Sequence, residues 1–431
     1  MTTDPVDAWL QRQAGLNPRD IELGLERVRR VWLRLGAPAP ARHVITVGGT
    51  NGKGSCVALL EAILGAAGYR VGCYTSPHLQ RYAERIRVDT EPLAEAQVLA
   101  ALQQAAAARR GTPLTYFELG TLAALQLFAA AGLDVAILEV GLGGRLDAVN
   151  IVDADAALVA TVDLDHQDWL GQDREAIGRE KAGIFRTSRP AICGDSEPPR
   201  SLVEAAADLG ADLYLQGRDF AVRLVGEQWQ WRGRRRDRVA LPLPSLRGPH
   251  QLDNAAAVLA VLEALEATLP VDQRVVREGL LAARLPGRFD VRRVAATTWV
   301  LDVAHNPEAA RALAANLGAQ FVAGRTHAVL GMLRDKDVAG VVRAVADRVD
   351  VWHLAGLDDP RGLDTRALAD RVRTALPGVQ PLLYPDLPGA LAAAAAAAGE
   401  ADRVLVLGSF HTVGSALDWL HADLRDSAES V

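Results

Sequence analysis

Residues 46–55 read TVGGTNGKGS and lie between the apolar run 43–47 and the apolar stretch SCVALLEAILGAAG. This order predicts a buried strand, a glycine-rich turn and a helix. Glycines let backbone N–H groups approach phosphate oxygens, the helix N-terminus adds partial positive charge, and Lys53 adds a full charge. The usual P-loop has lysine directly before Ser or Thr, whereas Gly54 separates Lys53 from Ser55 here. The stretch therefore predicts a variant nucleotide-binding loop.

Further apolar runs follow the loop and alternate with helical patterns. Strands are expected at 135–140, 156–162 and 189–193, and unbroken apolar runs are typical of parallel strands covered on both faces. The stretch 220–243 instead alternates around the basic turn RGRRRDR, so we expect a hairpin at the edge of the first domain, with solvated arginines. A helix is expected at 251–267.

Pro286 and Gly287 break the pattern and mark a domain boundary. A second α/β series follows, with strands expected at 299–303, 327–330, 351–354 and 404–407. The predicted fold class is α/β: an N-terminal P-loop ATPase-like domain with a mostly parallel sheet at 1–287, and a smaller C-terminal Rossmann-like domain at 288–431.

Composition narrows the class of protein. The chain has 431 residues, 49% hydrophobic and 23% charged, with a net charge of −6. These values are ordinary for a globular protein and argue against a general nucleic-acid binder. The three cysteines form no CxxC pair, and the start MTTDPVDAWL has neither a basic nor an apolar leader region. We expect a cytoplasmic enzyme that is a monomer and binds neither nucleic acid nor membrane.

Acidic and basic side chains follow the predicted strands of the first domain. Glu139 ends one strand just before GLGG, where a carboxylate can hold a metal ion beside the nucleotide loop. His166 follows the next strand, and the neighbouring Asp163, Asp165 and Asp168 favour a cation site. Lys181 is expected near the start of a helix, and spacing alone gives it no role beyond that of a surface lysine.

The second domain has a similar set. Asp302, His305, Ser409 and His411 lie at or just after predicted strands. Ligands of α/β sheets bind at the carboxyl ends of strands. Polar residues at this end in both domains predict a site between the two domains.

Motifs in a fixed order along nearly the whole chain resemble those of the Mur ligase superfamily, and within it the branch that acts on folates. The matching segments are GTNGKGS (49–55), TSPHLQRYAERIRV (75–88), TYFE (115–118), LEVGLGGRLDAVNIVD (138–153), DHQDWLG (165–171), REKAGIFR (179–186), GPHQLDNAAA (248–257), PGRFD (286–290), DVAHNP (302–307), GMLRDKD (331–337) and GSFHTV (408–413).

The resemblance implies residue roles that spacing does not. The implied ATP contacts are Asn51, Gly52, Lys53, Gly54, Ser55, Asn254, Arg288 and Asp302. The implied magnesium ligands are Ser76, Glu139, His166 and a carbamylated Lys181. The implied contacts to the pterin substrate are Thr115, Tyr116, Phe117, Leu146, Asp147 and Ala148. His305 and Ser409 resemble glutamate-side or phosphate-side residues; the implied catalytic residues are Lys53, Lys181, His166 and His305.

The implied activity is that of an ATP-dependent amide ligase that adds L-glutamate to dihydropteroate and to reduced folates through an acyl phosphate. Its expected cofactors are ATP and Mg²⁺ at two sites, with room for a monovalent cation. Gln251, Val149 and Tyr116 depart from the family's commoner Asn, Thr and Phe. Three alternatives stay open: a muramyl–amino acid ligase, an enzyme active on folates but not on dihydropteroate, and a non-catalytic P-loop protein.

Overall fold

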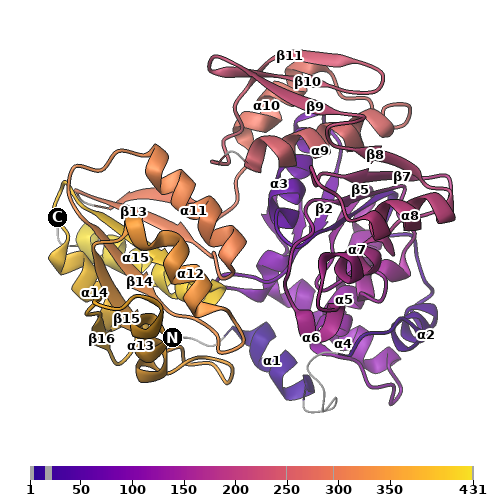
Figure 1. The fold of residues 1–431 in the computed structure, drawn as a ribbon. Coiled ribbons are helices and arrows are strands. Elements are labelled where there is room, and N and C mark those ends of the chain that lie inside the picture. Colours follow the sequence, from indigo (N-terminus) through magenta and orange to yellow (C-terminus); the bar gives the residue numbers. More distant parts are fainter. Residues whose placement is uncertain (1–3, 15–21, 249, 295, 430–431) are drawn as a thin grey trace. The chain divides into compact units, whose positions relative to one another are not determined.

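The computed structural model describes residues 4–14, 22–248, 250–294 and 296–429 (Figure 1). The chain folds into two compact units. The first comprises Met1–Ser245 and His250–Arg284, and the second comprises Leu246–Pro249 and Leu285–Val431. Within the described ranges, no helix combines the length and the apolar character needed to cross a bilayer.

Helices of the first unit surround a central sheet. They are α1 (Pro5–Ala14), α2 (Glu26–Arg34), α3 (Lys53–Ala66), α4 (Glu95–Ala108), α5 (Tyr116–Ala131), α6 (Gln167–Leu170), α7 (Arg174–Ala182), α8 (Arg200–Leu209), α9 (His250–Ala264) and α10 (Gln273–Ala282), with the 3₁₀ turns η1 (Tyr82–Arg85) and η2 (Ala148–Ile151). The sheet's strands are β1 (Ala41–Gly48), β2 (Val71–Tyr74), β3 (Ile86–Val88), β4 (Glu91–Pro92), β5 (Leu133–Glu139), β6 (Ala156–Val159), β7 (Pro190–Cys193) and β8 (Asp212–Leu215).

Strand order explains how distant segments come together. The eight-stranded sheet has the order β4-β3-β2-β5-β1-β6-β7-β8. In this order the strands from β2 to β8 pair in parallel, and β3 and β4 add antiparallel pairs at one edge. The carboxyl ends of neighbouring parallel strands lie along the same side of a sheet. The segments after β2, β5, β1 and β6 are therefore adjacent there, although they are far apart in sequence.

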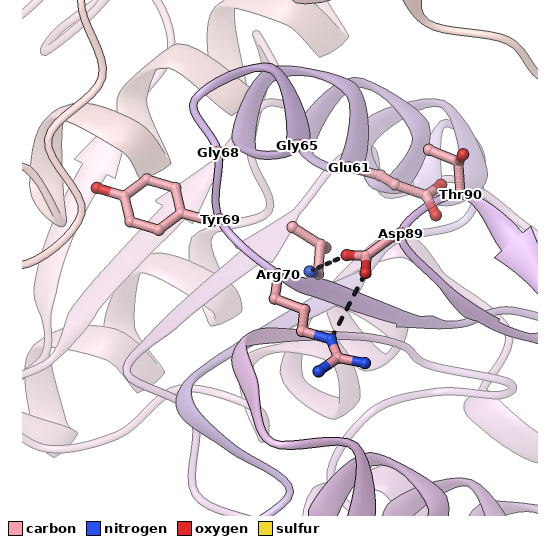
Figure 2. Close-up of a pocket in the computed structure, with 8 residues that line it drawn as sticks. Glu61, Gly65, Gly68, Tyr69, Arg70, Asp89 and Thr90 are labelled. Carbon is pink, nitrogen blue, oxygen red and sulfur yellow. Dashed lines mark hydrogen bonds and ion pairs between the residues drawn. The ribbon is translucent and has the colours of Figure 1, made fainter.

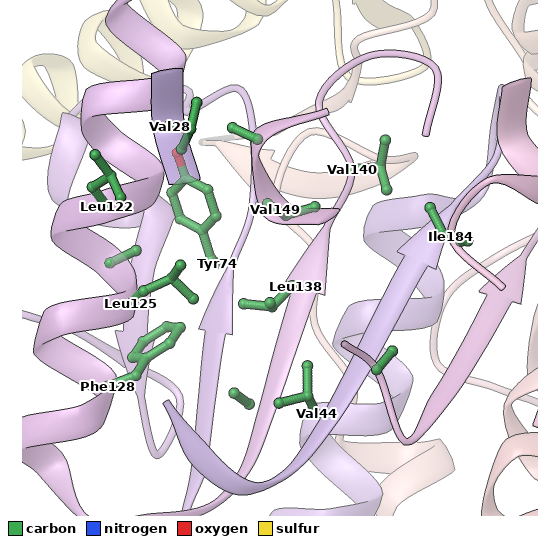
Figure 3. Close-up of a cluster of buried hydrophobic side chains, with 14 of the residues drawn as sticks. Val28, Val44, Tyr74, Leu122, Leu125, Phe128, Leu138, Val140, Val149 and Ile184 are labelled. Atoms are coloured by element: carbon green, nitrogen blue, oxygen red, sulfur yellow. The ribbon is translucent and has the colours of Figure 1, made fainter. Parts of the chain in front are cut away.

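The sheet is buried on both faces, which is why its strands read as continuous apolar runs. On one face, Leu138 and Val44 pack with Leu122, Leu125 and Phe128 of α5, as Figure 3 shows. The alternate residues of β5, Val135 and Ile137, are also fully buried. Complete burial of such a side chain stabilises the fold by roughly 1.5–3 kcal/mol.

We expected a hairpin at 220–243, but this segment forms a separate three-stranded antiparallel sheet. Strands β9 (Ala221–Val225), β10 (Gln228–Arg232) and β11 (Asp237–Pro242) run in the order β11-β10-β9. The buried Glu263 carboxylate accepts backbone N–H bonds from Arg234, Arg235 and Arg236 and so fixes the basic turn. The side chain of Arg234 lies 2.8 and 3.0 Å from the carboxylates of Asp212 and Asp219.

The second unit has its own sheet and core. Its strands are β12 (Asp290–Val294), β13 (Thr297–Asp302), β14 (Thr326–Leu330), β15 (Val351–Ala355), β16 (Leu382–Tyr384) and β17 (Arg403–Leu407). Its helices are α11 (Pro307–Ala319), α12 (Val338–Val345), α13 (Thr365–Ala375), α14 (Leu387–Ala397) and α15 (Phe410–Glu429), with the turn η3 (Ala346–Arg348). The order β12-β13-β17-β14-β15-β16 is parallel except for the β12–β13 pair.

Candidate active site

The glycine-rich loop joins β1 to α3. Gly49 and Gly52 have φ angles of +138° and +86°, which L side chains rarely adopt. A Cβ at Gly52 would lie 2.5 Å from Oδ1 of Asn254, so the loop and α9 approach each other too closely for any larger residue. Thr161 after β6 holds the loop, because its carbonyl accepts from Thr50 N at 2.7 Å and its hydroxyl accepts from Asn51 N at 3.1 Å. Thr161 was not anticipated, since a threonine after a strand carries no sequence signal.

The Lys53 ammonium lies over this loop. Nζ donates to the carbonyls of Gly49 and Thr50, both at 3.0 Å. Ser55 is buried in the first turn of α3, and Gly54 stands between the two. The variant spacing therefore still brings one cation and the N-terminus of a helix to the same loop.

Asn254 is fixed beside the loop by its own neighbours. Its Nδ2 donates to Gln251 Oε1 at 3.0 Å, and the Cys56 thiol lies 3.7 Å from its Oδ1. Gln251 thus orients Asn254 beside the loop. The departure from the family's commoner Asn at this position keeps an amide that can do so.

Ser76 and Glu139 meet where two neighbouring strands end. Ser76 N donates to Glu139 Oε2 at 3.1 Å, and Glu139 is only 5% exposed. The pairing Tyr74↔Leu138 explains the contact, since Ser76 follows shortly after the first of these residues and Glu139 directly after the second. A hydroxyl and a carboxylate are oxygen ligands of the kind that Mg²⁺ prefers.

His166 lies on the segment after β6, with a left-handed φ of +50° at the start of α6. The segment is tied to the glycine-rich loop, because Asp163 N and Thr50 Oγ1 are 3.0 Å apart. Within the described part of the chain, no group of three or more His, Cys, Asp or Glu side chains is placed to hold a metal ion. The aspartates around His166 therefore do not form a complete cation site by themselves.

Lys181 corrects a prediction from the sequence. It lies in the last turn of α7, not near the start of a helix, because Asp173 caps the N-terminus by accepting from Ala176 N and the helix ends at Ala182. It is 3% exposed rather than on the surface. Burial, and next the charge of Lys53, lower its pKa to about 7, against the opposing effect of Asp165 and Asp147. A neutral amine is thus accessible near physiological pH.

The two segments expected to hold a pterin lie against each other. Thr115 caps α5, and a Cβ at Gly141 would lie 2.6 Å from the Phe117 ring, so Phe117 packs on the GLGG turn. That turn leads to Leu146 and Ala148. Asp147 between them accepts from Leu142 N at 2.8 Å and Val149 N at 3.0 Å, and burial raises its pKa to about 7.

In the second unit, the expected residues gather at the ends of the neighbouring strands β13 and β17. Asp302 accepts from Phe289 N and Ala304 N, both at 2.8 Å, and burial raises its pKa. The Arg288 guanidinium lies 5.6 Å from the Phe410 ring centroid, and the His305 ring 6.2 Å from it. The buried Ser409 hydroxyl is 2.7 Å from that of Thr412, which the sequence did not single out.

A cavity of about 460 Å³ lies in the first unit, beside the C-terminal end of α3 (Figure 2). It is lined by Glu61, Gly65, Gly68, Tyr69, Arg70, Val71, Asp89 and Thr90. Gly65 is at the C-terminal end of the 14-residue helix α3, about 20 Å from its start at Lys53. The cavity is therefore separate from the glycine-rich loop.

Comparison with known proteins gives consistent matches. The Mur ligase middle domain matches residues 47–262, and the Mur ligase glutamate ligase domain matches residues 287–410. The chain is 45% identical to the dihydrofolate synthase/folylpolyglutamate synthase of Escherichia coli (strain K12), over 97% of this chain and 96% of the relative.

Solved structures agree. The E. coli FolC complex with DHPP and ADP superimposes with a TM-score of 0.91 at 45% identity, covering 98% of this chain and 99% of that one. A bifunctional folylpolyglutamate synthase/dihydrofolate synthase with Mn, AMPPNP and L-glutamate bound gives 0.88 at 47% identity, covering 97% and 98%.

Proposed function

The chain belongs to the Mur ligase family, and from this we propose that it is an ATP-dependent ligase that joins L-glutamate to dihydropteroate and to reduced folates. The observation that carries the proposal is the closeness of three features in the first unit. The glycine-rich loop with Lys53 and the bonded pair Ser76 and Glu139 follow neighbouring strands, and the buried Lys181 is close enough to Lys53 for that charge, after burial itself, to lower its pKa.

A nucleoside triphosphate fits these residues, and the adenine nucleotides ADP and AMPPNP are bound in the similar structures, which favours ATP. Asn51, Gly52, Lys53, Gly54 and Ser55 would hold its phosphates, because the loop has no Cβ at Gly52 and presents a cation and a helix N-terminus. Asn254 would contact ATP from α9. In the second unit, Arg288 and Asp302 would make further nucleotide contacts.

Magnesium fits the donors in the first unit. Ser76 and Glu139 would hold one ion, and His166 with a carbamylated Lys181 a second. Carbon dioxide adds to a neutral amine, and the lowered pKa of Lys181 supplies one. Bound magnesium would neutralise phosphate charge and polarise the phosphoryl oxygens.

The pterin would lie against Thr115, Tyr116 and Phe117 on one side and the segment Leu146–Ala148 on the other. Phe117 offers an aromatic face for stacking. Asp147, with a pKa near 7, can accept or donate a hydrogen bond to the ring. His305 and Ser409 would act on the glutamate or phosphate side.

The reaction would proceed in two steps. The folate carboxylate attacks the γ-phosphorus of ATP, which gives an acyl phosphate and ADP. The glutamate amine then attacks the acyl carbon, and inorganic phosphate leaves. The chain contributes mainly positioning and charge neutralisation, with Lys53 stabilising the charge that develops on the β- and γ-phosphates.

The test is ADP release by the purified full-length chain with ATP, Mg²⁺ and L-glutamate. Dihydropteroate and tetrahydrofolate should each stimulate it, while a UDP-muramyl acceptor should not. Stimulation by tetrahydrofolate alone would support the enzyme that lacks the dihydropteroate activity. Absence of stimulation by any acceptor would leave a non-catalytic nucleotide-binding protein.

A further inference from the structure

Asp7 in α1 joins two segments that are remote from it in sequence. Its Oδ1 accepts from the Tyr116 hydroxyl at 2.9 Å, and its Oδ2 lies 3.2 Å from His78 Nε2. The other ring nitrogen, His78 Nδ1, accepts from Arg85 Nε at 2.9 Å. Because arginine only donates, Nδ1 carries no proton, and Nε2–H therefore donates to Asp7. A continuous chain of hydrogen bonds runs from Arg85 through His78 and Asp7 to Tyr116.

The helix that carries Asp7 is fixed in place. Asp4 accepts from Val6 N at 2.8 Å through one carboxylate oxygen and from Tyr82 N at 2.7 Å through the other. Val6 and Leu10 are fully buried against the core of the first unit. The position of the Asp7 carboxylate is thus set by capping and by packing, and not only by its own bonds.

The network also balances charge. The Arg85 guanidinium is 8% exposed and lies 5.1 and 5.2 Å from the ring centroids of Tyr82 and Tyr116. Asp7 is the carboxylate in the same hydrogen-bond chain and is joined to Arg85 through His78. A buried cation is costly without a nearby anion. Neutralising Asp7 would therefore disturb Arg85 and the two tyrosine rings that its guanidinium contacts.

The two residues that bond to Asp7, His78 and Tyr116, both lie next to residues of the proposed ligase site. His78 is two residues after Ser76, whose backbone N–H bonds to Glu139. Tyr116 lies between Thr115 and Phe117, at the start of α5. A shift of the Asp7 carboxylate would move the Ser76 turn, which would hold the metal ion, through His78. It would also move the Thr115–Phe117 segment, which would contact the pterin, through Tyr116.

We propose that Asp7 is a positioning residue that sets the Ser76 turn and the Thr115–Phe117 segment relative to each other, and so aligns the dihydropteroate carboxylate with the bound triphosphate. The inference rests on the proposed function for the meaning of these two segments. It adds a residue from α1, outside the family motifs, to the machinery of the reaction.

The test compares Asp7→Asn and Tyr116→Phe with Asp208→Asn, a matched change at an exposed acid on α8. Dihydropteroate affinity is measured by calorimetry with a non-hydrolysable ATP analogue and Mg²⁺, and turnover is measured by ADP release. Asp7→Asn should weaken dihydropteroate binding about tenfold, equivalent to about 1.4 kcal/mol. It should also raise the Mg²⁺ concentration that gives half-maximal turnover. Tyr116→Phe should weaken dihydropteroate binding less, and Asp208→Asn should change neither quantity.

The double variant Asp7→Asn, Tyr116→Phe should lose less dihydropteroate binding free energy than the sum of the losses in the two single variants, because both changes act on one hydrogen bond. A merely structural role predicts something else: a smaller folded fraction with unchanged dihydropteroate affinity and Mg²⁺ dependence, and this result would overturn the inference. Tyr116→Phe keeps the ring, so it decides the matter if Asp7→Asn fails to fold. If the wild type binds dihydropteroate but does not turn over, the proposed function fails, while the affinity comparison still tests Asp7.

Discussion

Lys181 in the first unit and His353 in the second are both buried bases, 3% and 1% exposed, and burial is the main cause of the lowered pKa of each. Their neighbours differ. His353 Nδ1 is 3.0 Å from the Tyr384 hydroxyl and Nε2 is 3.3 Å from His327 Nδ1, so both ring nitrogens have partners within the fold. After burial, the charge of a second base is the next cause of the lowered pKa in both places, His327 for His353 and Lys53 for Lys181. His327 bonds directly to His353 between two strands, whereas the Lys53 ammonium bonds to the carbonyls of the glycine-rich loop.

The difference separates a structural network from the ligand site that we propose. A buried polar chain whose atoms are satisfied by neighbouring strands stabilises a sheet and needs no ligand. Two lysines near one loop are a repulsive arrangement that phosphate or a carbamate would relieve. The use of lysine at these two positions agrees with this interpretation. The chain has 47 lysines and arginines, and only Lys53, Lys181 and Lys336 are lysine. Arginine would keep its charge at either position.

The largest expected effect is on the lysine side of this comparison. Lys53→Ala should reduce turnover on the order of 10³-fold or more, because a cation facing the developing phosphate charge is lost. Thermal unfolding should be nearly unchanged, since the Nζ hydrogen bonds to Gly49 and Thr50 stay within one loop. Steady-state ADP release measures the first quantity. Near-normal turnover would remove Lys53 from the site.

Replacing Lys181 should have the next largest effect. Lys181→Ala and Lys181→Arg should both lower turnover about 100-fold or more, because neither can carry the carbamate. Acetate should restore part of the activity of the Ala variant, since it can enter the space left by the side chain, and none of that of the Arg variant. An active Lys181→Arg enzyme would show that positive charge, and not a carbamate, is what the site requires.

The smallest effect on activity is expected on the histidine side. His353→Phe should leave turnover at pH 8 within about twofold, because the change is confined to the sheet of the second unit. It should change how stability depends on pH. The folded-state pKa of about 4 lies below the ordinary value of 6.5, so the unfolded chain binds more protons between these values.

Wild-type stability should therefore fall as pH drops from about 6.5 to about 4, and the Phe variant should lose this contribution to the slope. Denaturant midpoints at pH 5 and pH 8 provide the comparison. If the denaturant midpoint changes equally between pH 5 and pH 8 in the two proteins, the fold does not hold His353 neutral.

The same contrast shows how far sequence reasoning reaches. The strands β1, β5, β13 and β17 were predicted because each is an unbroken apolar run with a turn signal after it. The exposed strand β16, which supplies Tyr384 to the histidine pair, was not predicted because its apolar run is only three residues long. The turn at Gly226 between β9 and β10 was also missed, so three strands were predicted as one hairpin.

At the site, the sequence predicts the type of residue at strand ends. The roles that the family resemblance implies for these residues stay predictions. Lys181 was placed at the wrong end of its helix because the capping Asp173 was not recognised as the start of α7. Its burial and its closeness to Lys53 depend on packing between segments that are far apart in sequence. Asp7 was missed for the same reason, since its partners His78 and Tyr116 are reached only through the folded sheet.

Whether Lys181 carries carbon dioxide is the most direct test of the proposed mechanism. The protein is equilibrated with ¹³C-bicarbonate at pH 8, above the pKa of about 7, and examined by ¹³C NMR, with Lys181→Arg as control. We predict a carbamate signal of about one per chain in the wild type and none in the variant, with turnover falling when bicarbonate is removed. A fully active wild-type enzyme without a carbamate signal would contradict the mechanism.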